Sequence, residues 1–136
     1  MKEFVHNVKI RFGHVDAAGI VFHPRYFEMA NDAIEDWFSQ LGFPFSDMHL
    51  KKEFGVPLVH IEADFLRPTR LGDELALTLT VSKMGRSSLE LNIAAACRGE
   101  ARFVMNAVIA YVDLKKGKAA EWNPAIKAAI AGWLKD

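Results

Sequence analysis

The sequence has little cysteine and no excess of charge of either sign. Cys97 is the one cysteine among 136 residues, so an internal disulfide framework is excluded and a reducing compartment, most simply the cytoplasm, is expected. The 17 basic and 17 acidic side chains cancel. Without a net positive field, the chain has no general attraction for nucleic acid or an anionic membrane surface. We therefore expect neither as a partner.

Long apolar runs and targeting signals are also missing. No stretch reaches the roughly 18 consecutive apolar residues of a membrane span, and the opening MKEFVHNVKI carries charges where a signal peptide has its apolar core. There is no internal repeat, low-complexity tract or linker. With 51% hydrophobic and 25% charged residues, the chain has the balance of a soluble globular protein, and we expect a single domain over residues 1–136.

Several catalytic motifs can be excluded by spacing. His6, His14, His49 and His60 do not follow a metal-ligand pattern, and one cysteine cannot supply a thiolate cluster, so no metal is expected. The G-x-S-x-G elbow of serine hydrolases is absent, and Cys97 lies in a predicted strand. Walker and dinucleotide glycine loops are absent too.

What the sequence does contain is clear hydrophobic periodicity. From Phe4 to Phe12, a period of two places Val8, Ile10 and Phe12 on one face of a predicted strand. A helix is predicted over 24–41, where Pro24 suits the first turn and Gly42 suits a left-handed cap. Its apolar stripe is broad enough to be enclosed by a sheet, and it consists of Tyr26, Phe27, Met29, Ala30, Ala33, Ile34, Trp37, Phe38 and Leu41.

Four further strands supply that sheet. Alternating residues such as Leu75, Leu77 and Leu79 indicate strands with one face in a core. Turn-forming residues separate them, so the last three strands are predicted to form an antiparallel meander. Asn123 is expected to cap a short C-terminal helix in NPAIKAAIAGWLKD, residues 123–136. The predicted class is α+β, with an antiparallel five-stranded sheet around one long helix. The four strands are predicted at 56–66, 73–83, 87–98 and 100–114.

Asp16 is the first candidate for chemistry, because it lies between the first strand and the long helix in GHVDAAGIVFHPRYF, residues 13–27. An aspartate there is also an ordinary turn or cap residue. However, we expect the neighbours Ile20, Val21 and Phe22 to bury its carboxylate, which would raise its pKa and suit it to act as a base or nucleophile. Gly19 would supply the unusual backbone angle of the loop.

His23 precedes Pro24 at the start of the helix, where free backbone donors and the helix dipole favour negative charge. A histidine at this position is also a common cap or packing residue. We expect its backbone N–H, rather than its imidazole, to matter for an oxyanion.

A third group of donors lies at a predicted turn between two strands. Lys83, Arg86, Ser87 and Ser88 combine cations and hydroxyls next to a glycine, which suits a phosphate or a pantetheine amide. Such groups are also found at solvated hairpin tips.

Together these motifs resemble a known family. The segment RFGHVDAAGIVFHPRYF is similar to the signature of the 4-hydroxybenzoyl-CoA thioesterase group of hotdog-fold proteins, and FLRPTRLGDEL at 65–75 and KMGRSSLEL at 83–91 resemble later motifs of hotdog proteins. The resemblance implies the hotdog fold, pairing with a second subunit into a continuous sheet, and active sites at the dimer interface. It also implies a homodimer or a dimer-of-dimers tetramer.

The resemblance assigns roles to individual residues. Asp16 would act on the thioester carbonyl as nucleophile or general base, and the backbone N–H of His23 would polarise that carbonyl. Asn31 stands where the 4-hydroxybenzoyl enzymes carry an acid, which puts that substrate in doubt, and Phe22 with His23 suggests an aryl or short aliphatic acyl group. Gly19, Phe22 and Asn31 would contact the substrate, while Lys83, Arg86, Ser87 and Ser88 would bind the CoA tail.

The resulting prediction is an acyl-CoA thioesterase that needs no metal or organic cofactor, with coenzyme A as part of its substrate. A thiolate with a pKa near 8.5 leaves without assistance, so a positioned attacker and an oxyanion donor suffice. The alternative from another class is a non-catalytic module that binds an acyl-CoA or acyl-carrier ligand. A hotdog dehydratase lacks support, because no matching His and Glu arrangement is found.

Overall fold

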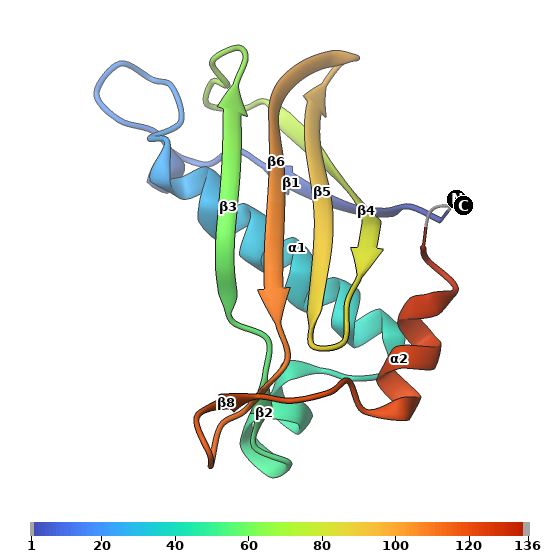
Figure 1. Cartoon of the computed structure of the whole chain (residues 1–136). Coiled ribbons are helices and arrows are strands. Elements are labelled where there is room, and N and C mark those ends of the chain that lie inside the picture. Colours follow the sequence, from blue (N-terminus) through green and yellow to red (C-terminus); the bar gives the residue numbers. More distant parts are fainter. Residues whose placement is uncertain (1, 135–136) are drawn as a thin grey trace.

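The computed structural model describes residues 2–134 and contains one long helix, α1, crossed by a five-stranded antiparallel sheet (Figure 1). The strand order is β1-β4-β5-β6-β3, so the last three strands form the predicted meander. The predicted α+β class and sheet are confirmed. The main elements are β1 (Phe4–Lys9), α1 (Pro24–Leu41), β3 (Leu58–Phe65), β4 (Glu74–Met84), β5 (Ser88–Cys97), β6 (Glu100–Ala110) and α2 (Pro124–Ala131).

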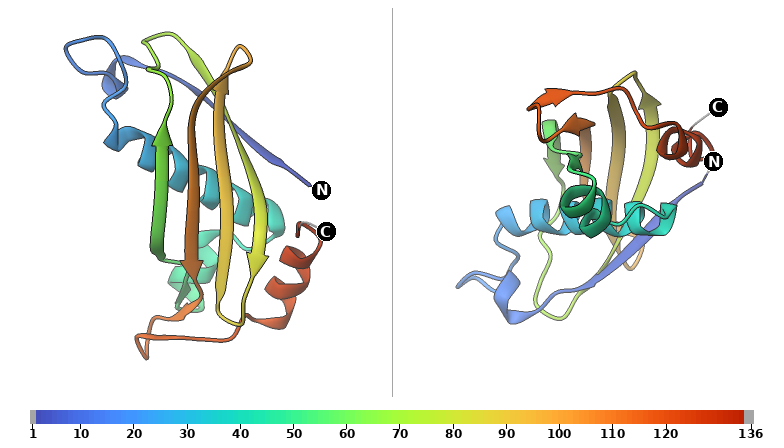
Figure 2. Two further views of the ribbon diagram at one scale, coloured as in Figure 1. Left: turned by 45° about the horizontal axis from the view of Figure 1, so that its top comes forward. Right: turned by 90° about the horizontal axis from the view of Figure 1, so that it is seen from below.

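Helix α1 begins and ends where the sequence predicts. Pro24 occupies its first turn, and Gly42 takes a left-handed φ of 97° while its N–H donates to the Phe38 and Ser39 carbonyls. The sheet curves around the helix (Figure 2), so the apolar stripe is enclosed, and Trp37 and Phe38 are fully buried. Burying each such side chain stabilises the fold by about 2–3 kcal/mol.

The sheet contributes the other half of the core through side chains that alternate between its two faces. Leu75, Leu77 and Leu79 on β4 are fully buried, while the intervening Ala76 and Thr78 are half-buried. The same period of two continues on β5 and β6, as predicted for strands with one face against a helix. The core therefore lies between α1 and the concave face of the sheet.

The first strand is shorter than predicted, and one of its residues points the other way. Ile10 is 1% exposed, but Phe12 is 82% exposed, so its predicted place on the inward face is wrong. The chain leaves the sheet at Ile10 and forms a short 3-10 helix, η1 (Phe12–His14), in which the Arg11 N–H donates to Nδ1 of His14. This turn reverses the side-chain alternation.

The predicted strand at 100–114 is also interrupted. It breaks after Ala110, and Tyr111 stacks between Phe54 and Trp122 with ring centroids 5.0 and 4.8 Å away. Beyond this point lies a small second sheet that the sequence did not indicate, because its strands are only two residues long. Its strands are β2 (Phe54–Gly55), β7 (Val112–Asp113) and β8 (Lys118–Ala119), and the six-residue helix η2 (Ser46–Lys51) precedes it.

The C-terminal helix α2 has the predicted cap, because Oδ1 of Asn123 accepts hydrogen bonds from the N–H groups of Ala125 and Ile126 at 2.8 and 3.4 Å. The helix ends at Ala131, and the last two residues of the predicted segment lie outside the described residues. None of the helices within residues 2–134 is both long and apolar enough to cross a membrane.

Candidate active site

The segment between Val15 and His23 forms a tight loop at one end of the sheet. The Asp16 N–H donates to the Ile20 carbonyl, and the Gly19 N–H donates back to the Asp16 carbonyl, both at 3.0 Å. Gly19 has a φ of 77°, a conformation that favours glycine. The unusual backbone angle predicted for Gly19 is therefore confirmed, and the backbone geometry holds Asp16 in a defined position.

This loop is hydrogen-bonded to a second loop, residues 67–73. The Val21 N–H donates to the Thr69 carbonyl at 2.8 Å, and the Leu71 N–H donates to the Gly19 carbonyl at 3.3 Å. The loop at 67–73 comes from the motif RPTRLGD. This second loop therefore holds the Asp16 loop in place.

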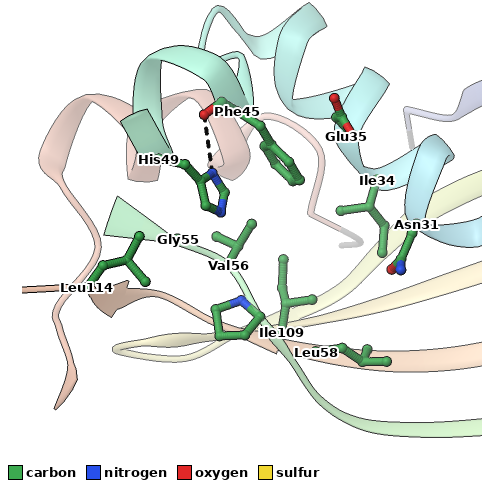
Figure 3. A pocket seen from close by; sticks show the side chains of 11 residues that line it. Asn31, Ile34, Glu35, Phe45, His49, Gly55, Val56, Leu58, Ile109 and Leu114 are labelled. Atoms are coloured by element: carbon green, nitrogen blue, oxygen red, sulfur yellow. Dashed lines mark hydrogen bonds between the residues drawn. The ribbon is translucent and has the colours of Figure 1, made fainter. Parts of the chain in front are cut away.

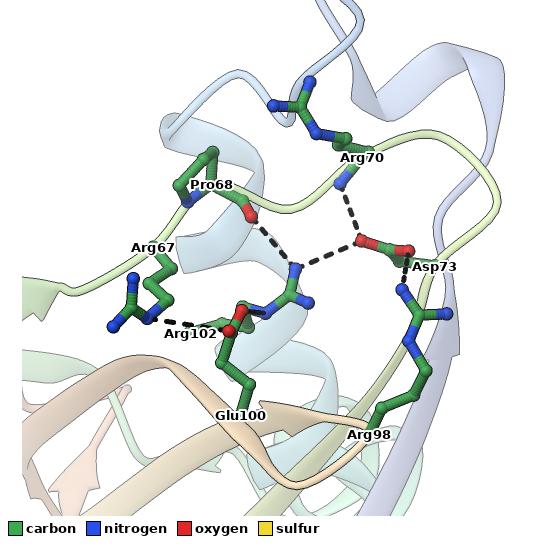
Figure 4. A network of polar contacts seen from close by, with 7 residues as sticks. All are labelled: Arg67, Pro68, Arg70, Asp73, Arg98, Glu100 and Arg102. Atoms are coloured by element: carbon green, nitrogen blue, oxygen red, sulfur yellow. Dashed lines mark hydrogen bonds and ion pairs between the residues drawn. The ribbon is translucent and has the colours of Figure 1, made fainter.

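Asp73 and its partners hold that supporting loop in place (Figure 4). One carboxylate oxygen of Asp73 accepts from the Arg70 N–H and from Arg102, at 3.0 and 3.1 Å, and the other accepts from Arg98 at 3.0 Å. Arg102, whose side chain is 7% exposed, also donates to the Pro68 carbonyl. The Arg70 N–H, followed by the guanidinium groups of Arg102 and Arg98, outweighs burial and lowers the pKa of Asp73.

The Asp16 carboxylate has a contrasting environment. It is exposed in the single chain, and its Oδ1 accepts one local hydrogen bond, from the Ala18 N–H at 2.9 Å. The expectation that its apolar neighbours bury it is wrong here. Val21 turns into the core at 6% exposure while Phe22 turns outward at 49%, so these neighbours flank the carboxylate without covering it.

Asp16 lies at the edge of an open pocket of about 560 Å³. The pocket has mostly apolar walls from the loop, the start of α1 and the end of β3, with a backbone donor at the helix start. An acyl group and a polar reacting centre could both be accommodated. The lining residues are Asp16, Ile20, Val21, Phe22, His23, Tyr26, Phe65, Leu66, Arg67 and Pro68.

The helix start leaves one backbone donor unpaired at a residue that lines that pocket. Pro24 has no N–H, and the N–H groups of Arg25 and Tyr26 donate to the Phe22 and His23 carbonyls at 2.8 and 3.1 Å. Among residues 2–134, no protein acceptor pairs with the His23 N–H. His23 makes no side-chain cap, and its imidazole packs between Phe22 and Phe65. The several donors expected at this helix start therefore reduce to one.

The predicted CoA-binding group lies elsewhere in the single chain. Lys83, Arg86, Ser87 and Ser88 form the β4–β5 hairpin at the end of the sheet opposite the Asp16 loop (Figure 1). Their backbone is tied to the C-terminal segment, since the Arg86 carbonyl accepts from the Trp122 N–H at 3.1 Å. The Arg86 side chain remains 83% exposed beside Glu121. One chain does not bring these residues to Asp16.

Asn31 is also separated from Asp16, because it lines a second cavity farther along α1 (Figure 3). This cavity includes His49 and Glu35, which no sequence motif singled out. Helix α1, η2, the β2–β3 segment and β6 each contribute to it. No local spacing rule can bring such distant segments together. Within the described residues, no three His, Cys, Asp or Glu side chains are placed to hold a metal ion.

Comparison with known proteins identifies the family. Residues 10–130 match the model of the thioesterase-like superfamily. The chain belongs to this superfamily. The 1,4-dihydroxy-2-naphthoyl-CoA hydrolase of Acaryochloris marina is 30% identical over 105 residues, which is 76% of each chain. The corresponding hydrolase of Prochlorococcus marinus strain MIT 9303 is 30% identical over 132 residues, or 92% of this chain and 85% of the relative.

Solved structures of the superfamily share the fold. Slr0204, a 1,4-dihydroxy-2-naphthoyl-CoA thioesterase from Synechocystis, superposes with a TM-score of 0.87 over 96% of both chains at 21% identity. The predicted hotdog fold and the resemblance to hotdog thioesterases are thereby confirmed, as is the prediction of a thioesterase-type enzyme. The roles of individual residues remain predictions.

Proposed function

We propose that this member of the thioesterase-like superfamily hydrolyses an aryl-CoA thioester to the free acid and coenzyme A. The observation that carries the proposal is that two residues with suitable groups line the same pocket. Asp16 has an exposed carboxylate, and the backbone N–H of His23 has no protein acceptor among the described residues. The substrates named for the two naphthoyl-CoA hydrolases favour an aromatic acyl group over a short aliphatic one.

The chemistry requires only these two groups and water. As a nucleophile, an Asp16 oxygen attacks the carbonyl carbon, the carbon–sulfur bond breaks, and CoA leaves as a thiolate. Water then hydrolyses the resulting anhydride and regenerates the carboxylate. As a general base, Asp16 instead takes a proton from the water that attacks. In both routes the His23 N–H donates to the carbonyl oxygen as negative charge develops, and a donor of this kind contributes about 3 kcal/mol.

A second copy of the chain would bring the separated parts together. Strand β3 is an open edge of the sheet, and Val59, Phe65 and Leu66 on or beside it are 59%, 46% and 52% exposed. Such an edge is suited to pairing with the same edge of another copy. Because that pairing is antiparallel, the partner's β4–β5 hairpin lies at the end where Asp16 lies. Lys83, Arg86, Ser87 and Ser88 would then bind the CoA tail across the interface.

A thiol-release assay over aryl-, short-chain and long-chain acyl-CoA esters tests the function. The expected result is rapid release from 1,4-dihydroxy-2-naphthoyl-CoA and related aryl esters, and slow release from aliphatic ones. Tight acyl-CoA binding without thiol release would support a non-catalytic binding module instead. Light scattering tests the assembly, with a mass of two or four chains of 15.2 kDa expected. A monomer would contradict the shared interface.

A further inference from the structure

The second cavity lies between the middle of α1 and the start of β3 and has a volume of about 380 Å³ (Figure 3). Its walls are mainly apolar, and a dry apolar cavity of about 150 Å³ already holds a benzene ring. The space therefore suits two fused aromatic rings. The apolar walls come from Ile34, Phe45, Val56, Pro57, Leu58, Ile109 and Leu114, and polar groups from Asn31, Glu35 and His49.

His49 presents a hydrogen-bond acceptor at this cavity. Its Nδ1 lies 3.2 Å from the Phe45 carbonyl oxygen, and since a carbonyl only accepts, Nδ1 carries the proton in the neutral ring. The other nitrogen, Nε2, is then an acceptor. Among the described residues no protein donor is paired with Nε2. The half-buried imidazole is thus oriented by the protein and left with one unused acceptor.

Gly55 helps to make this arrangement possible. A Cβ atom added at residue 55 would stand 2.9 Å from Nε2 of His49 and 3.3 Å from the Leu114 side chain. An alanine there would push the imidazole away from its position. The ring also packs against Phe45, with centroids 4.8 Å apart, so two contacts and the absent Cβ together set where Nε2 points.

We infer that this cavity binds the aromatic ring of the acyl group and that Nε2 of His49 accepts a hydrogen bond from a hydroxyl on that ring. The inference rests on the proposed function and narrows its substrate class to hydroxylated aryl-CoA esters. A hydroxyl donor satisfies the acceptor that the protein leaves unpaired, whereas an unsubstituted ring would leave it buried without a partner. Asn31 lies across the cavity from His49 (Figure 3), where its amide can meet a second polar substituent.

The thioester attached to this ring would lie in the Asp16 pocket of the partner chain. Leu58, at the start of β3, lines the His49 cavity, and Phe65, at its end, lines the Asp16 pocket. Centred antiparallel pairing of β3 with its copy sets the Leu58 end beside the partner's Phe65. The cavity of one chain then adjoins the reacting groups of the other, so each complete site uses two copies.

Comparing substrates with and without the hydroxyl groups isolates the role of His49. Wild-type protein should favour 1,4-dihydroxy-2-naphthoyl-CoA over 2-naphthoyl-CoA in kcat/KM by about 10- to 100-fold. The His49→Phe variant should lower kcat/KM for the dihydroxy ester at least tenfold more than for 2-naphthoyl-CoA, so that the preference is lost. The His49→Gln variant keeps a side-chain acceptor and should recover part of the preference. Equal losses on both substrates in His49→Phe would mean a merely structural role and would overturn the inference.

Binding of the free acids separates this inference from the proposed function. Calorimetry with 1,4-dihydroxy-2-naphthoate and 2-naphthoate requires no hydrolysis, and wild type should bind the dihydroxy acid more tightly, with the difference lost in His49→Phe. If no CoA ester is hydrolysed, the proposed function fails, yet this binding difference would still support the cavity. Equal binding of the two acids by wild type would overturn the cavity assignment even if thioesters are hydrolysed.

Mixing an inactive variant with a variant that has lost hydroxyl selectivity tests the assignment to the partner chain. After Asp16→Asn and His49→Phe chains are refolded together, half of the dimers are mixed, and each contains one intact site out of two if the site spans the interface. Hydroxyl-selective hydrolysis should then return to roughly a quarter of the wild-type level. No recovery in the mixture, with mixed dimers verified by mass, would place both groups in one chain and overturn the shared arrangement.

Discussion

Asp16 and Asp73 lie at the same end of the molecule, yet their surroundings are opposite. Asp73 is nearly buried and accepts hydrogen bonds from the Arg70 N–H and two guanidinium groups, whereas Asp16 is exposed and accepts one, from Ala18. The donors around Asp73 lower its pKa, which favours the ionised carboxylate that the three hydrogen bonds hold in the fold. The contrast distinguishes a carboxylate that stabilises the fold from a carboxylate that is accessible to a ligand.

The two acids are nevertheless mechanically linked. The Asp73 network fixes the loop at 67–73 (Figure 4), and the Thr69 carbonyl of that loop holds the Val21 N–H of the Asp16 loop. A preorganised carboxylate requires a rigid support, because small displacements of a reacting group cost much of its effect. Asp73 thus helps to fix the position of Asp16 through the backbone hydrogen bonds between the two loops.

Asp16→Asn should have the largest effect on activity. The amide cannot attack the thioester or accept a proton from water, so kcat should fall by about a thousandfold. The free energy of unfolding should change by less than about 0.5 kcal/mol because the side chain is exposed. Thiol release and urea denaturation measure the two quantities, with Glu74→Gln, a variant of another exposed acid, as the control. Nearly full activity in Asp16→Asn would remove Asp16 from the mechanism.

Asp73→Asn should mainly affect stability. The buried Arg102 would lose one of its two carboxylate partners and keep Glu100, whose oxygen lies 3.1 Å away. The free energy of unfolding at pH 7 should therefore fall by about 2 kcal/mol. Because the pKa of Asp73 is lowered from 3.8 in the folded state, its ionic contribution is present above about pH 4 and is lost as the pH falls through the folded-state value. The gap between wild type and variant should therefore narrow in acid.

Urea denaturation at pH 7 and at pH 3 measures that gap, and Glu74→Gln again serves as the control. A difference of the same size at both pH values would show that Asp73 acts through shape rather than charge.

The hairpin cations should give an intermediate effect. Lys83 and Arg86 are exposed, like Asp16, and the Lys83→Gln, Arg86→Gln double variant should raise KM for a CoA ester by about 5- to 10-fold with kcat unchanged. A thioester of N-acetylcysteamine has no phosphates and should show no change. The exposed Lys127→Gln variant on α2 controls for net charge. An equal KM rise on both substrates would argue against phosphate binding by this hairpin.

His23→Ala should have the smallest effect. The backbone N–H survives the substitution, so kcat/KM should stay within about threefold of wild type, with the small loss coming from removed packing against Phe22 and Phe65. Steady-state kinetics on the best aryl ester measure the ratio. A loss of more than a hundredfold would assign the chemistry to the imidazole instead of the backbone.

Local patterns were sufficient for most of the fold. The period of α1, its proline start and its glycine cap involve residues within a few positions of each other, so the bounds at Pro24 and Leu41 were predictable. The loop conformation at Gly19 was equally local. The break after Ala110 was not predictable, because contacts of Tyr111 with the distant Phe54 and Trp122 accompany it. The outward position of Phe12 was missed because the chain leaves the strand and turns into the 3-10 helix η1.

By itself, the sequence determined the long helix, the main antiparallel strands, the family signature and the chemical identity of Asp16 and His23, since each depends on residue type and short spacing. Only the tertiary structure decided that Asp16 is open, that one backbone donor remains at the helix start, and that His49 faces a cavity with Asn31. Exposure, hydrogen-bond pairing and cavity walls depend on segments far apart in the chain. Their positions follow from packing, which no local pattern encodes.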